Sequence, residues 1–160
     1  MSRVMEVSEE KLQQAAEAGK SLEIRGLIFA DSYRGHLDRV LQVLLAYYER
    51  PELAPVVSAV ALELTLWASL ANMRQIYFAD YELDLSDSEQ LRVREAGFQA
   101  SINRRESYYR GQAREQGLYL NTRITHNLAG LRLEVMNNAV HSAPLEEHLR
   151  AYLARAMEYT

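Results

Sequence analysis

A long apolar stretch from Leu53 to Phe78 constrains the fold more than any other part of the chain. Placed at 100° per residue from about Pro55 to Phe78, it forms a helix with apolar side chains on almost every side. Glu63 and Arg74 interrupt the run, and charged side chains are costly inside a lipid bilayer. We therefore predict a buried central helix, packed on at least two sides, rather than a membrane span.

Small and polar side chains gather on one narrow seam of this predicted helix. The seam consists of Ser58, Thr65, Ser69 and Asn72. Either the seam faces the rest of the chain, or it meets a second subunit. From the second alternative we predict a homodimer that self-associates through this seam.

Other parts of the chain also carry helix signals, which are capping residues, terminating residues and apolar spacings of three and four. The predicted helices cover residues 8–19, 31–50, 86–116 and 118–141, with a last helix after Pro144. Residues 21–29 alternate briefly, so they fit either an extended segment or the start of the next helix. The predicted fold is all-α, a bundle of about five helices in a single domain over residues 1–160. Residues 1–30 form a short helix and lead-in, and 31–160 the bundle.

The composition excludes several classes of chemistry. The chain has 160 residues and no cysteine, so disulfides and cysteine zinc sites are excluded. We find no cofactor fingerprint and no nucleophile with a recognisable base, and we expect no cofactor and no enzymatic activity. The N-terminal residues do not form a secretory signal, and arginine greatly outnumbers lysine. We expect a cytoplasmic, bacterial protein.

The predicted helix 118–141 carries an apolar stripe and, opposite it, a polar face. The stripe consists of Leu120, Ile124, Leu128, Leu131, Val135 and Ala139. The polar face consists of Arg123, His126, Asn127, Gly130, Glu134, Asn137, Asn138 and His141. We predict that this polar face binds another protein.

Within that face, residues 126–130 read H-x-L-x-G. This resembles the phosphoryl-accepting motif of histidine phosphotransfer domains, which are helical bundles. The resemblance implies phosphotransfer through His126 as an alternative function. Ala129 stands where that motif usually has a lysine.

Metal and nucleic-acid binding are weaker interpretations. His36, His126, His141 and His148 form no pair with the spacing of helical metal ligands, so we predict no metal site. Six arginines lie in residues 88–116, but four glutamates accompany them. We interpret these residues as charged pairs on a solvated helix, and nucleic-acid binding is not expected.

Tyrosine content and charge distribution favour protein contact. The chain has ten Tyr against three Phe and one Trp, and tyrosine suits surfaces that are buried only part of the time. Acidic residues outnumber basic ones by 14 to 8 in residues 1–87, whereas basic residues outnumber acidic ones by 10 to 8 in residues 88–160. We predict a regulatory or adaptor protein that acts by protein–protein interaction. A small-molecule sensor with a pocket near Trp67 is a further alternative.

Overall fold

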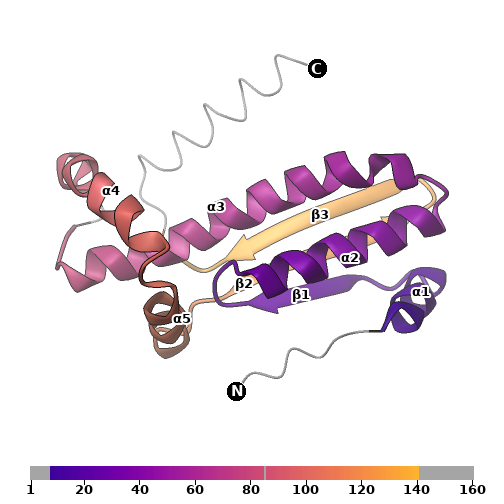
Figure 1. The fold of residues 1–160 in the computed structure, drawn as a ribbon, viewed down its shortest axis with the longest axis horizontal. Helices are drawn as coiled ribbons and strands as arrows, with labels where there is room; N and C mark the ends of the chain where they lie inside the picture. The colour runs from indigo at the N-terminus through magenta and orange to yellow at the C-terminus, as the bar shows by residue number, and fades with distance from the viewer. Residues whose placement is uncertain (1–7, 85, 141–160) are drawn as a thin grey trace, which may run out of the picture. The chain divides into compact units, whose positions relative to one another are not determined.

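The computed structural model describes residues 8–84 and 86–140. In this part of the chain, five α-helices and one short 3₁₀ helix accompany a three-stranded antiparallel sheet (Figure 1). The prediction of an all-α helical bundle is therefore wrong, and the protein is mixed α/β. The described residues divide into two compact units. Unit 1 comprises 8–69 and 119–137, and unit 2 comprises 70–118 and 138–140. The single domain over 1–160 stays a prediction.

The helices of unit 1 follow the sequence signals closely. They are α1 (Glu9–Glu17), α2 (Asp31–Tyr47), the 3₁₀ helix η1 (Pro51–Leu53) and the part of α3 (Ala54–Asp80) up to Ser69. Ser8 caps α1 as predicted, since its hydroxyl accepts a hydrogen bond from the amide of Lys11 at 3.4 Å. The helix predicted over 31–50 is confirmed as α2, and its side chains at Leu37, Leu41 and Leu44 are fully buried.

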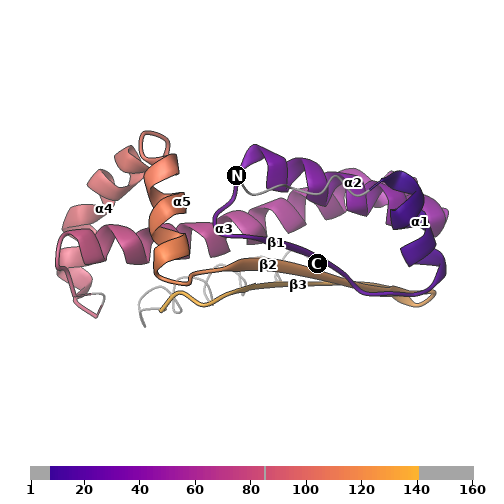
Figure 2. The same ribbon diagram turned by 90° about the horizontal axis from the view of Figure 1, so that it is seen from below.

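The sheet of unit 1 has the order β1-β2-β3, with both pairs antiparallel. Strand β1 (Leu22–Gly26) occupies the alternating stretch for which the sequence left two alternatives, and β2 (Leu120–Asn127) pairs with it. Figure 2 shows α2 and the first part of α3 on one face of this sheet. The core lies between these helices and the sheet, where Leu120 and Ile124 pack with the buried side chains of α2. We call the other side of the sheet the open face.

The predicted helix 118–141 is a β-hairpin, formed by β2 and β3 (Gly130–Asn137). The apolar stripe misled the prediction because spacings of four residues satisfy the period of a strand as well as that of a helix. Along β2 every second residue is buried from Leu120 to His126, which is a strand pattern that includes the polar Thr122. Leu128 belongs to the predicted stripe, yet it lies in the turn and is 97% exposed.

Unit 2 contains the rest of α3, followed by α4 (Ser88–Ile102) and α5 (Glu106–Glu115). Aromatic side chains, chiefly Tyr77, Phe78, Phe98 and Tyr109, form its interior. The single helix predicted over 86–116 is thus two helices, which separate at residues 103–105. The Ser101 hydroxyl donates to the carbonyl of Phe98 at 2.6 Å just before the break. Such local bonds compete with helix continuation.

The helix α3 is less buried than its composition predicts. Among the described residues, the stretch Pro51–Asp80 alone is long and apolar enough to cross a membrane, by length and composition, and 17% of its most apolar window is buried. Val56, Val60 and Leu64, which recur every four residues, are 65%, 52% and 40% exposed. The expected packing on two sides is therefore not found in unit 1, where the described residues leave an apolar strip of this helix exposed.

Candidate interaction surface

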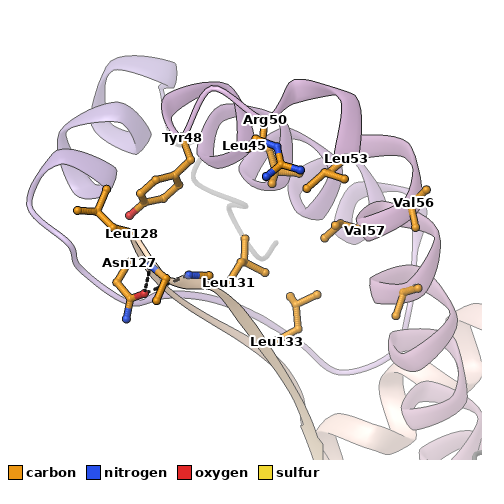
Figure 3. Close-up of a pocket in the computed structure, with 13 residues that line it drawn as sticks. Leu45, Tyr48, Arg50, Leu53, Val56, Val57, Asn127, Leu128, Leu131 and Leu133 are labelled. Atoms are coloured by element: carbon orange, nitrogen blue, oxygen red, sulfur yellow. Dashed lines mark hydrogen bonds between the residues drawn. The ribbon is translucent and has the colours of Figure 1, made fainter. Parts of the chain in front are cut away.

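An apolar groove of about 560 Å³ lies at one end of unit 1 (Figure 3). Its residues come from the end of α2, the following turn, the start of α3 and the β2–β3 hairpin. They are Leu45, Tyr48, Arg50, Leu53, Val56, Val57, Val60, residues 127–131 and Leu133. Aliphatic side chains dominate this lining, and the one charged side chain, Arg50, is paired with Glu52 at 2.6 Å. The groove therefore suits an apolar occupant.

The tip of the hairpin is held in a fixed turn that exposes Leu128. The side-chain oxygen of Asn127 accepts hydrogen bonds from the amides of Ala129 at 2.8 Å and Gly130 at 3.2 Å. This pattern is an Asx turn, which fixes the backbone locally. Leu128 consequently projects into solvent at the rim of the groove, beside the other aliphatic side chains that line it.

His126 lies next to the groove but is not available as a nucleophile. It is 8% exposed, and both ring nitrogens have partners. Nε2 lies 2.9 Å from the carbonyl oxygen of Lys20, and Nδ1 lies 2.7 Å from the hydroxyl of Tyr48. Because a carbonyl only accepts, Nε2 donates to Lys20, and in the neutral ring Nδ1 then accepts from the hydroxyl of Tyr48. A phosphoryl acceptor needs an exposed nitrogen, so this geometry does not favour phosphotransfer through His126.

The structure disperses the predicted polar binding face. Residues 123 and 134 lie on the open face of the sheet, whereas His126 points toward the helices. Residues 127 and 130 are in the hairpin turn and line the groove. The amide of Asn137 donates to the carbonyl of Ala68 at 2.8 Å, and that of Asn138 donates to the carbonyl of Gly117 at 3.0 Å. His141, with His148, lies outside the described residues. Two of the eight predicted residues therefore belong to the groove.

Three of the four residues of the predicted self-association seam are buried in the described structure, and self-association through the seam stays a prediction. The side chains of Thr65, Ser69 and Asn72 are at most 1% exposed, and Ser58 is half-buried. Ser69 Oγ accepts from the amide of Phe29 at 2.7 Å, and the Thr65 hydroxyl donates to the carbonyl of Ala61 at 2.7 Å. The Thr65 hydroxyl also lies 3.4 Å from that of Thr122 on β2, so within unit 1 this part of α3 faces the sheet. On the same helix, Val56, Val60 and Leu64 are exposed.

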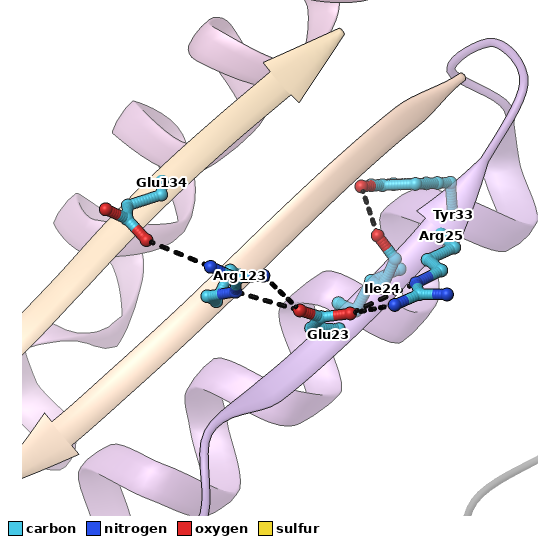
Figure 4. A network of polar contacts seen from close by, with 6 residues as sticks. All are labelled: Glu23, Ile24, Arg25, Tyr33, Arg123 and Glu134. Carbon is cyan, nitrogen blue, oxygen red and sulfur yellow. Dashed lines mark hydrogen bonds and ion pairs between the residues drawn. The ribbon is translucent and has the colours of Figure 1, made fainter. Parts of the chain in front are cut away.

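Charged side chains form a connected network on the open face (Figure 4). Arg123 of β2 lies between Glu23 of β1 at 2.8 Å and Glu134 of β3 at 4.0 Å. Arg25 contacts Glu23 at 2.5 Å, and Arg132 contacts Glu134 at 2.7 Å. The hydrogen bonds from Arg25, and then from Arg123, hold the pKa of Glu23 below its ordinary value. The charges alternate in sign across the strands.

Three of the six arginines in residues 88–116 form ion pairs with acidic side chains. Arg92 pairs with Glu89, and Arg110 pairs with Glu106 on the next helix. Arg105 contacts Asp80 at 3.3 Å and lies 4.1 Å from the ring centre of Tyr108. For these three arginines the contacts agree with the interpretation as charged pairs, and for Arg94, Arg104 and Arg114 it stays a prediction. Among the described residues no three His, Asp or Glu side chains are grouped so that they could hold a metal ion.

Comparison with known proteins adds no assignment, because no family model, curated protein or solved structure matches the chain.

The groove residues that sequence reasoning missed are Leu128 and the valines at the start of α3. Leu128 was missed because residues 118–141 were predicted as a helix, in which Leu128 belongs to the apolar stripe. Val56 and Val60 were missed because α3 was predicted to be buried on at least two sides. An available signal was the asparagine at 127 followed two and three residues later by Ala129 and Gly130, which is a common turn composition.

Proposed function

We propose that the protein is a non-enzymatic regulatory or adaptor module that acts by binding another polypeptide in the groove at the end of unit 1. The observation that carries the proposal is the exposure of the groove's aliphatic side chains, above all Leu128 at 97% and Val56 at 65%. Exposed aliphatic residues that surround a concave surface are typical of protein interaction sites.

A polypeptide fits this groove better than a small ligand. Small-molecule sites enclose most of the ligand and add a few converging polar groups. Here the aliphatic residues continue beyond the groove along α3 to Leu64, which is 40% exposed and does not line it. A partner that covers both the groove and the exposed side chains of α3 up to Leu64 must extend along several turns of helix. A metabolite is too small to do so.

The test is site-specific photo-crosslinking. A photoreactive phenylalanine analogue is placed at position 128 or 56 in the cells that produce the protein. Position 93 of unit 2 serves as the matched control, because Val93 is an aliphatic residue of similar exposure, 60%. We expect adducts of one defined mass from positions 128 and 56 and none from 93, and Val60→Asp should reduce their yield. Equal adduct patterns at all three positions, or none at any, would overturn the proposal.

A further inference from the structure

In the described part of the chain, strand β3 is an edge strand of the sheet. The order β1-β2-β3 gives it a neighbour on one side, and within residues 8–84 and 86–140 no strand pairs with its outer side. Exposed edges invite pairing with another chain, and natural proteins block them with charged side chains, especially lysine, with proline, with bulges or with short strands. The two charged side chains of β3, Arg132 and Glu134, are of opposite sign, so a second copy can pair with them. The eight residues of β3 include neither lysine nor proline, and all of them pair in continuous register with β2.

The two faces of β3 limit how it could pair with a second copy of itself. Leu131, Leu133 and Val135 face the helices and pack against the core, while Arg132 and Glu134 face the open side. Directly opposed residues of an antiparallel pair lie on the same face of the sheet. A symmetric pair that keeps apolar residues with apolar ones must therefore be centred on a residue, where that residue meets its own copy.

Charge then favours one centre, because among pairs centred on residues 131–135 only the pair centred on Leu133 sets side chains of opposite charge opposite each other. A pair centred on Arg132 sets two arginines opposite each other, and a pair centred on Glu134 sets two glutamates opposite each other, which is unfavourable. A pair centred on Leu133 sets Arg132 of each copy opposite Glu134 of the other. Glu23, Arg123 and Glu134 already lie side by side across the three strands. In this pair, Arg132 of the second copy lies next to Glu134, so negative and positive side chains also alternate across the new interface.

We propose that β3 pairs antiparallel with β3 of a second copy, centred on Leu133, so that the two sheets become one. This deepens the proposed function, on which it rests, by naming the groove's partner as the same chain. The groove supports this pairing because Leu131 and Leu133 line it from the strand while Val56 and Val60 line it from α3. Apolar side chains of the second β3 enter on the same face as Leu133 and cover surface that is exposed in one copy.

A disulfide test reads the register directly, since the chain has no cysteine of its own. In Leu133→Cys the new thiol meets its own copy, at a Cα separation of about 5 Å that permits a disulfide. Leu131→Cys is the matched control on the same strand and face. Its two copies would lie about 13 Å apart, beyond the reach of a disulfide. We expect a covalent dimer from Leu133→Cys under mild oxidation and a monomer from Leu131→Cys.

A charge exchange tests the pairing without covalent chemistry. Arg132→Glu and Glu134→Arg each set like charges opposite each other, so each variant alone should dissociate about tenfold more readily than the parent. In an equal mixture, the two introduced side chains face each other with opposite charge, and the native Arg132 of one variant faces the native Glu134 of the other. We expect the mixture to recover dimers by light scattering, with circular dichroism showing that both variants are folded.

The outcomes separate this inference from the proposed function. Equal crosslinking of Leu133→Cys and Leu131→Cys, or no recovery on mixing, overturns the register. If the parent is a monomer and the photoreactive residue at 128 captures a different protein, the self-pairing is overturned while the proposed function stands. If the parent is a monomer and no adduct forms, both are overturned.

Discussion

The hydroxyl of Tyr48 lies 2.7 Å from Nδ1 of His126, which joins the end of α2 to β2 across 78 positions of the sequence. The same imidazole donates from Nε2 to the carbonyl of Lys20, just before β1. One side chain thus connects a helix end, the central strand and the segment that leads into the edge strand β1. The hydrogen bond between His126 and Tyr48 fixes the position of the hairpin relative to the end of α2. Tyr48 and Asn127, the neighbour of His126, line the groove, so this bond also helps to set the groove's shape.

Tyr48→Phe removes the hydroxyl and leaves Nδ1 of the buried His126 without its donor. An unsatisfied buried acceptor costs about 1–3 kcal/mol, and we expect the free energy of unfolding to fall by that amount. Urea denaturation measures it. The adjacent Tyr47 is 42% exposed, so Tyr47→Phe is the control and should change stability by less than about 0.5 kcal/mol. Equal effects of the two substitutions would contradict the assigned role of the hydrogen bond.

The sequence predicted the elements whose burial follows one clear period, and failed where two periods coincide. On α2, Leu37, Leu41 and Leu44 are a helical stripe that no strand can present on one face. On β2, Leu120 and Ile124 are four residues apart, which is compatible with either structure, and the decisive residue between them is Thr122. Its buried hydroxyl lies 2.9 Å from that of Tyr33, a contact between positions 89 apart that no local pattern reveals.

The candidate site was harder to predict because it depends on what the fold leaves uncovered. The sequence shows that α3 is apolar on almost every side. It does not show that α2 and the sheet cover only one of these sides. The predicted polar face around His126 exists only if residues 118–141 form a helix. In a strand, successive residues point to opposite faces of the sheet, so these residues are divided between the two faces. Asn127 and Gly130 reached the groove because both belong to the turn, not because of a shared helical face.

Ser69→Arg tests whether the small-residue seam lies inside the chain. Ser69 is 1% exposed and its hydroxyl oxygen accepts from the amide of Phe29. An arginine there buries a charge and displaces the sheet-facing side of α3, so we expect loss of the cooperative unfolding transition rather than dissociation of a folded dimer. Leu66→Arg is the control, since Leu66 is 39% exposed on the same helix and should tolerate the charge. If the parent is a dimer and Ser69→Arg is a folded monomer, the seam is an intersubunit surface instead.

The ion pairs of Glu23 should make stability depend on pH in the acidic range. Arg25 and Arg123 lower the pKa of Glu23 in the folded protein from its ordinary value of 4.5. The unfolded chain therefore binds this proton at higher pH than the folded chain. Its stabilising contribution is complete above about pH 4.5 and is lost as pH falls through the lower folded pKa.

We expect Glu23→Gln to lower the urea midpoint at pH 7 and to differ less from the parent as the pH falls below 4. Salt at 1 M should reduce the difference at pH 7, because screening weakens exposed ion pairs. A difference that stays constant from pH 7 to pH 3 would show that Glu23 acts through packing instead.

Two helical glycines of unit 2 should respond oppositely to alanine. Around Gly111 no atom lies within 4 Å of an added Cβ, so Gly111→Ala should stabilise the protein by about 1 kcal/mol through helix propensity. At Gly97 the added Cβ would lie 2.5 Å from the hydroxyl oxygen of Tyr77, which is 4% exposed. We expect Gly97→Ala to lose this gain or to destabilise the protein, because the buried ring must shift.

Removing the hydroxyl of Tyr77 should reverse the effect at Gly97. With Tyr77→Phe the nearest ring atom is about 3.7 Å from the added Cβ, which is ordinary van der Waals contact. Gly97→Ala should then stabilise the Tyr77→Phe protein by roughly the same 1 kcal/mol as Gly111→Ala does the parent. Thermal or urea unfolding of the four proteins in this cycle measures the coupling. If Gly97→Ala has the same effect in both backgrounds, the hydroxyl is not what excludes a side chain from this position, and the close approach of α3 to α4 has another cause.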